Sequence, residues 1–105
     1  EMIEQVYKFS TGDEKVIEKV IFDGNLNYIH LVFNMDDSLP EHYSNSNVYM
    51  TVVRGYLTIR LGNQQPAVYE KGTLLKIPKD TLMNVSNKHN VTLEIIIVKA
   101  PAPSN

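Results

Sequence analysis

The residues best suited to chemistry lie in the stretch PEHYSNSNVYMTVVRG, residues 40–55. His42 follows a proline that fixes the backbone, and Ser44 and Asn47 come just before an apolar segment. An imidazole can exchange a proton near neutral pH or ligate a metal, whereas serine and asparagine offer neutral groups that orient a sugar or an amide. The cluster therefore predicts either a metal site or a polar ligand pocket.

A second histidine, His30, lies twelve residues before His42 in the segment NYIHLVF. If both rings point the same way, the pair could bind a carboxylate or act as an acid and a base. The register across the intervening irregular turn decides the direction of His30, and sequence parity does not carry across such a turn. Both directions stay open. Glu94, in the last apolar segment, is predicted to face solvent, with the pocket as the alternative, and His89 is predicted to be an exposed turn residue.

The elements that must hold these residues are short and β-rich. Gly, Asp and Asn turn signals divide the chain into runs of Val, Ile, Tyr, Thr and Leu at intervals of about ten residues, which is typical of an antiparallel sandwich or barrel. The predicted fold class is all-β. Residues 15–22 also fit a helix after a capping box, but four β-branched residues favour a strand. In residues 56–61, strict alternation predicts a strand buried on one side. The predicted strands are KVIEKVIF, NYIHLVF, NVYMTVV, YLTIRL, TLLKIP, TLMNVS and VTLEIIIVK.

Composition limits the partners and the setting of the chain. At 105 residues, 43% hydrophobic and 21% charged, it predicts one globular domain over residues 1–105. A net charge of -2 without a basic cluster argues against nucleic acid, and the absence of cysteine removes disulfides and thiolate ligands. No apolar run nears the roughly 20 residues of a membrane span, and EMIEQVYKF lacks signal-peptide features. We expect a cytoplasmic protein without a membrane partner, with the tail APAPSN on the surface.

The spacing of several residues resembles the cupin family of jelly-roll barrels, which carry two motifs. The first motif runs glycine, five residues, His-x-His, three or four residues, glutamate, six residues, glycine. In this chain Gly55 closes it, His42 is its first histidine, and Asp36 stands at its opening glycine. The resemblance covers residues 26–100, preceded by predicted N-terminal strands in residues 2–22.

The second motif runs glycine, five residues, proline, x, glycine, two residues, histidine, three residues, asparagine. Gly72, Pro78 and Asn87 match it, and Asp80 stands at its second glycine. The resemblance implies an antiparallel barrel of the cupin type, with the interval between Gly55 and Gly72 typical of small members.

In metal-bearing cupins, two histidines and a glutamate of the first motif and one histidine of the second bind a divalent ion. Those positions hold His42, Ser44, Val48 and Met83 in this sequence. A catalytic zinc, iron or manganese ion needs about three imidazole or carboxylate ligands, so we expect no metal and no other cofactor. If a metal binds, His42 and His30 are the candidates.

Two methionines allow a different interpretation. Met83 stands at the fourth ligand position, and Met50 shares a strand face with Val48. Two thioethers and an imidazole are soft donors that suit Cu(I). Methionines at core spacing more often fill gaps in packing, and that interpretation is favoured.

The leading hypothesis is a small metal-free cupin that binds a small polar organic molecule, such as a sugar, an amide or a carboxylate, inside the barrel. One alternative is an enzyme of the isomerase or metal-dependent oxygenase type built around His42 and His30. Another is a dimeric interaction module with a vestigial pocket. A homodimer is expected, because small cupins often pair through sheet edges and the segment MIEQVYKF would otherwise be an exposed strand. The predicted pocket residues are His42, Ser44, Val48, Met50, Met83, His30 and Asn47.

Overall fold

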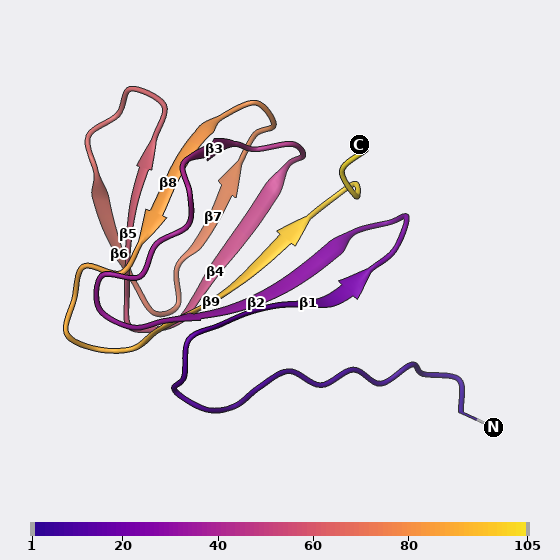
Figure 1. Cartoon of the computed structure of the whole chain (residues 1–105). Coiled ribbons are helices and arrows are strands. Elements are labelled where there is room, and N and C mark those ends of the chain that lie inside the picture. Colours follow the sequence, from indigo (N-terminus) through magenta and orange to yellow (C-terminus); the bar gives the residue numbers. More distant parts are fainter. Residues whose placement is uncertain (1, 105) are drawn as a thin grey trace.

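Two antiparallel sheets pack face to face in the computed structural model, which describes residues 2–104 (Figure 1). Its strands are β1 (Val16–Phe22), β2 (Asn27–Phe33), β3 (His42–Tyr43), β4 (Val48–Arg54), β5 (Tyr56–Leu61), β6 (Ala67–Glu70), β7 (Leu74–Ile77), β8 (Leu82–Ser86) and β9 (Leu93–Lys99). One sheet has the order β1-β2-β9-β4-β7 and the other β3-β8-β5-β6. The first residue of EMIEQVYKF and the last of the tail lie outside the described residues.

The core lies between the two sheets because alternate residues of each long strand are apolar. In β5, Leu57 and Ile59 are buried while Tyr56 is exposed, which confirms the predicted one-sided strand. The segment predicted as either a strand or a helix is strand β1. The core is formed by Leu31, Phe33, Val48, Met50, Val52, Leu57, Ile59, Ile77, Met83, Val85, Leu93, Ile95 and Ile97.

The N-terminal arm, residues 2–15, differs from its prediction, because it forms no strand. It runs past β1 and β2 and continues beyond the sandwich (Figure 1), where no neighbouring strand offers it hydrogen-bonding partners. The sequence pattern also missed β3 and β6, which are too short to show a period. Residues 2–104 contain no helix that is long and apolar enough to cross a membrane.

Five described residues have a left-handed backbone, and four of them, all except Gly62, fall on the four glycine positions of the cupin motifs. Gly55 and Gly72 have φ values of 81° and 87°, and the aspartates that replace glycine, Asp36 and Asp80, have φ values of 69° and 67°. Aspartate tolerates this region better than most residues, since its short side chain can hydrogen-bond locally. The turns thus keep the motif geometry without all of its glycines.

Asn87, the final residue of the second motif, fastens the loop that follows β8. Its buried side-chain amide donates to the carbonyl oxygens of Phe33 and Val91, at 3.1 and 2.8 Å. Its side-chain oxygen accepts a hydrogen bond from the backbone N–H of His89 at 2.9 Å. His89 is consequently half-buried and packs on Tyr56, with ring centroids 5.0 Å apart, which corrects its prediction as an exposed turn residue.

Replacing glycine with alanine is expected to cost more stability at Gly55 than at Gly72. An added β-carbon at Gly55 would collide with the carbonyl oxygen of Thr92, whereas at Gly72 it would meet no atom within 4 Å. Gly55→Ala should lower the free energy of unfolding by about 3 kcal/mol, and Gly72→Ala by about 1 kcal/mol, the cost of a left-handed alanine. Urea denaturation of the two variants measures the difference, and equal losses would contradict this account.

Candidate functional site

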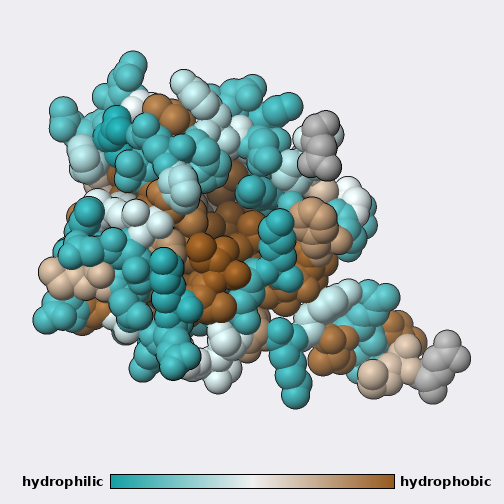
Figure 2. All heavy atoms as spheres, viewed as in Figure 1, coloured by the Kyte–Doolittle hydropathy of each residue, from teal (hydrophilic) through white to brown (hydrophobic). Residues whose placement is uncertain are grey.

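A cavity of about 160 Å³ lies between the two sheets at one end of the barrel. Its walls are almost entirely apolar, and apolar side chains are visible in a hollow on the face shown in Figure 2. One lining residue, Ile17, is 53% exposed, so the cavity opens to solvent beside β1. The lining residues are Ile17, Ile29, Leu31, Leu39, His42, Val48, Met50, Met83, Val85, Ile97 and Lys99.

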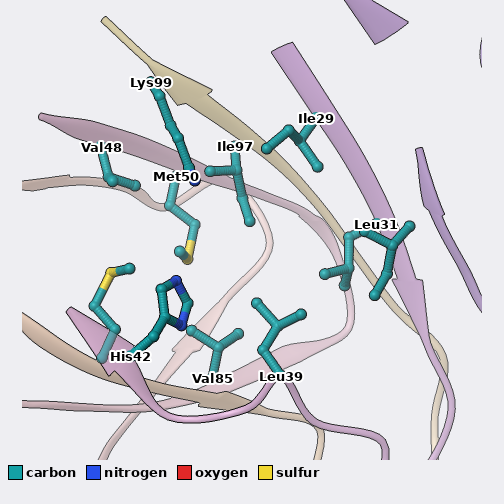
Figure 3. A pocket seen from close by; sticks show the side chains of 11 residues that line it. Ile29, Leu31, Leu39, His42, Val48, Met50, Val85, Ile97 and Lys99 are labelled. Atoms are coloured by element: carbon teal, nitrogen blue, oxygen red, sulfur yellow. The ribbon is translucent and has the colours of Figure 1, made fainter. Parts of the chain in front are cut away.

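His42 is an exposed residue of β3 at the rim of this cavity, and a local contact fixes its ring. Its Nδ1 lies 2.9 Å from the carbonyl oxygen of Pro40, which can only accept, so Nδ1 carries the hydrogen of the neutral ring. The other nitrogen, Nε2, then has a free lone pair. In Figure 3 the ring and the side chain of Met50 point toward one another across the cavity. His42 therefore presents a hydrogen-bond acceptor or metal ligand to the interior.

Lys99 is the second polar residue of the lining, and its place in the pocket was not predicted from the sequence. Partial burial, with a smaller contribution from the nearby Lys19, lowers the pKa of its ammonium group. The side chain reaches into the cavity from the end of β9 (Figure 3). Parity along β9 was the available signal, since Lys99 continues the inward series of Leu93, Ile95 and Ile97.

Four of the predicted pocket residues meet at the cavity, namely His42, Val48, Met50 and Met83. Ser44 does not line it. The buried Ser44 hydroxyl donates to the Pro78 carbonyl oxygen at 2.8 Å and accepts from the Thr81 N–H at 2.9 Å. It therefore joins the chain after β3 to the turn between β7 and β8, instead of occupying the position of a metal ligand.

Asn47 also lies away from the cavity. Its side-chain oxygen accepts a hydrogen bond from the backbone N–H of Lys79 at 3.3 Å, and it borders a shallow surface hollow next to Pro101. The tail that contains Pro101 is held on the surface, because Ala102 donates its N–H to the backbone carbonyl oxygen of Asn25.

Within residues 2–104, no three His, Cys, Asp or Glu side chains are grouped so that they could hold a metal ion.

His30 lies on the opposite side of the five-stranded sheet from the cavity. Its neighbours on β2, Ile29 and Leu31, line the cavity, and alternation along the strand turns His30 outward. His42 lies in β3 of the other sheet and faces the cavity, so the five-stranded sheet separates the two rings of the proposed acid–base pair. The alternative site built from both histidines is not formed.

The buried His30 ring is held between two carboxylates. Nδ1 lies 2.7 Å from Glu18 and Nε2 lies 2.6 Å from Glu94. An ionised carboxylate only accepts hydrogen bonds, so the ring satisfies both contacts when both of its nitrogens carry hydrogen. Glu94 also binds Arg54 at 2.9 Å, so the predicted solvent-facing carboxylate is mostly covered.

The contacts of His30 with Glu18 and Glu94, here called the His30 centre, hold one end of the N-terminal arm against the sheet. The ring of Phe9 packs on His30 with centroids 4.2 Å apart, and the Ser10 hydroxyl and N–H both donate to Glu18. Arg54 reaches from the end of β4 to the Asp13 carboxylate at 2.6 Å. The arm is consequently anchored at residues 9–13, before it leaves the sandwich.

No family model matches the sequence. An uncharacterized protein of Methanocaldococcus jannaschii is 35% identical over 103 residues, which is 97% of this chain and 89% of the relative. A crystal structure from the same organism, of an RmlC-like cupin family protein with a double-stranded β-helix fold, matches with a TM-score of 0.94 at 35% identity. That match covers 98% of this chain and 95% of the other.

The chain belongs to the cupin family. A cupin superfamily protein of Desulfitobacterium hafniense shares the fold more distantly, with a TM-score of 0.74 at 10% identity over 89% of this chain and 83% of that one. The family resemblance and the all-β jelly-roll fold predicted from the sequence are confirmed. This cupin differs from the metal-bearing pattern at Ser44, Val48 and Met83, whose places in the structure are described above.

We expect Glu18→Gln to destabilise this cupin at neutral pH and to have less effect in acid. The hydrogen bond from His30, reinforced by Ser10, lowers the pKa of the Glu18 carboxyl below its usual range. Such a group stabilises the fold above its unfolded pKa of about 4.3, and this stabilisation is lost as the pH falls through the folded pKa. Urea denaturation from about pH 7 to about pH 3 measures the effect.

Glu70→Gln is the matched control, because Glu70 is an exposed carboxylate at the end of β6. It should change stability little across the same range, since isolated surface charges contribute little. If both variants behave alike at every pH, the His30 centre does not stabilise the fold in the way its geometry indicates.

Proposed function

We propose that this cupin binds a small, largely apolar organic acid in its barrel cavity. The single observation that carries the proposal is an open apolar cavity of about 160 Å³ whose only two polar lining residues are His42 and Lys99. An apolar cavity of about 150 Å³ is large enough for benzene, so the ligand body is of that size. Ligand sites typically combine such apolar walls with a few placed polar groups.

The two polar groups narrow the chemistry of the ligand. Lys99 is a cation whose ammonium is penalised by burial, so an anionic group beside it would offset that penalty. His42 offers the lone pair of Nε2, which suits a hydroxyl or N–H donor on the ligand. Of the sugar, amide and carboxylate classes considered from the sequence, a carboxylate with an apolar body therefore fits best. A sugar would leave most of its hydroxyls against apolar walls, without partners.

Binding is favoured over catalysis because the cavity offers one imidazole and one amine. Acid–base chemistry there would rest on His42 and Lys99 alone, because the described lining residues include no carboxylate and His30 lies on the far side of the five-stranded sheet. A sensor or carrier for a small acid requires only affinity and selectivity. Those are the properties that an apolar cavity with two polar anchors provides.

A thermal-shift series tests the proposal, with benzoate and small branched carboxylates as probes and glucose and acetamide as polar comparisons. An acid present at about 100 times its Kd should stabilise the fold by about 2.7 kcal/mol, because it binds only the folded chain. Lys99→Met keeps the length of the side chain and removes its charge, so it should weaken binding of the acid about tenfold, or about 1.4 kcal/mol.

Lys88→Met is the control for this variant, because Lys88 is exposed in the loop after β8 and does not line the cavity. It should bind the acid as the parent protein does. Stabilisation by glucose or acetamide but by no apolar acid would contradict the proposal, as would equal effects of the two lysine substitutions.

Two copies of the chain are proposed to associate through the N-terminal arm. Beyond its anchor, the arm exposes the side chains of Ile3, Val6 and Tyr7, with Ile3 fully exposed. Hydrophobic groups are visible on this projecting arm in Figure 2. The outer face of the five-stranded sheet adds Ile96 and Val98 at positions that a solvated sheet would fill with polar residues.

A homodimer would cover both features at once, because a two-fold axis places the arm of each copy against the sheet of the other. Exposed apolar surface of this kind otherwise tends to aggregate. The dimer is independent of the ligand proposal. It accounts for an arm that is firmly anchored at one end and extends into solvent at the other.

The double substitution Ile3→Asp and Val6→Asp should convert the dimer to a monomer, because it places charges in a buried apolar contact. Sedimentation equilibrium should give the parent protein twice the 12.0 kDa mass of the chain, and the variant about half of the parent's value. Val68→Asp, at an exposed position on β6, should remain dimeric. A monomeric parent protein, or dissociation of the control as well, would contradict the proposed interface.

A further inference from the structure

Three soft donor side chains lie on the wall of the barrel cavity. Met83 and His42 are direct partners in the pairing of β8 with β3, so their side chains are neighbours on one sheet. Met50 lies on β4 in the facing sheet and points toward His42 across the cavity (Figure 3). The two methionines are 1% and 3% exposed, so both thioethers are held inside the protein.

The tautomer of His42 suits this arrangement. Metal-binding histidines usually donate one ring N–H to a carbonyl or carboxylate, which leaves the other nitrogen free for the ion. His42 donates from Nδ1 to the Pro40 carbonyl oxygen, so Nε2 is the free donor atom. A histidine fixed in this way binds a cation without first breaking a hydrogen bond at the ligating nitrogen.

The donor set selects the kind of cation. Among residues 2–104, no carboxylate or thiolate lines the cavity, so hard ions such as Mg²⁺ or Mn²⁺ and thiolate-dependent sites find no ligands in that part of the chain. Thioether sulfur selects soft ions such as Cu(I), and imidazole nitrogen also binds copper. We propose that Met50, Met83 and Nε2 of His42 form a binding site for Cu(I) inside the barrel.

Lys99 is the one lining group that acts against a cation. Burial and the nearby Lys19 lower the pKa of its ammonium group. The apolar walls offer almost no oxygen ligands, which favours a soft ion over a hard one. This site is inferred independently of the organic ligand proposed above, although both occupants would use Nε2 of His42, and its test uses the metal alone.

Methyl NMR of methionine tests the site directly, because the chain has four methionines and two of them are outside the cavity. Met2 and Met35 are 68% and 55% exposed. Protein labelled at the methionine methyl groups is titrated with Ag(I), a redox-inert soft ion, and then with Cu(I) under anaerobic reducing conditions. The signals of Met50 and Met83 should shift and saturate at one equivalent, while those of Met2 and Met35 stay in place.

Competition with a chromophoric Cu(I) chelator then measures affinity. Met50→Leu and Met83→Leu each remove one sulfur while roughly conserving volume, so both should fold and both should weaken Cu(I) binding at least tenfold. Met35→Leu is the control and should bind as the parent protein does. The proposal is overturned if the buried methionine signals do not move, if all four move without a stoichiometric end point, or if the three leucine variants bind alike.

Discussion

The structure depends on the alternation of side chains along β9, which lies between β2 and β4 in the middle of the five-stranded sheet. Successive residues of this strand must point to opposite faces. Leu93, Ile95 and Ile97 therefore enter the core, while Glu94 turns outward to His30 and Arg54. The same alternation continues to Lys99, which reaches the cavity. One strand thus provides three core residues, the lysine of the cavity and one carboxylate of the His30 centre.

The two histidines show how the surroundings determine what a side chain can do. His30 is enclosed by carboxylates and by Phe9, so both of its nitrogens are used in holding the arm to the sheet. His42 uses one nitrogen on the Pro40 carbonyl oxygen and keeps the other free. The five-stranded sheet separates the two side chains: the outer histidine is structural, and the inner one, on the other sheet, is available to a ligand or an ion.

The fold could be predicted from the sequence because its signals are local. Turn residues at regular intervals and runs of β-branched residues define the strands, and the motif spacing through Gly55, Gly72 and Asn87 defines the family. The site could be predicted only in part from the sequence, since the direction of a side chain at a strand or turn depends on register. His42, Val48 and Met83 line the cavity at their motif positions, and Met50 lines it because it shares a strand face with Val48, whereas the directions of Ser44 and His30 follow from contacts distant in sequence.

Lys99 and the N-terminal arm show two different reasons why a sequence pattern can fail to predict where a residue lies. The position of Lys99 followed from simple parity, but a lysine at the end of a strand is ordinarily assigned to solvent. The apolar residues of the arm predicted a strand, yet a strand exists only when another edge is available for pairing, and that is a property of the assembly. A sequence pattern shows which residues of a segment can be buried. It does not show which surface the segment packs against.

The hydroxyl of Ser44 also bears on how readily a metal-bearing cupin and this one can be interconverted. Because it bridges the Pro78 carbonyl oxygen and the Thr81 N–H, replacing it with the histidine of the family motif would remove both bonds at once. Each buried group left unsatisfied costs about 1 to 3 kcal/mol. A single mutation would thus remove the contacts that hold the turn between β7 and β8 before any ion could compensate. Converting one kind of barrel into the other would therefore require compensating changes around residues 78–81 in addition to the change at the ligand position.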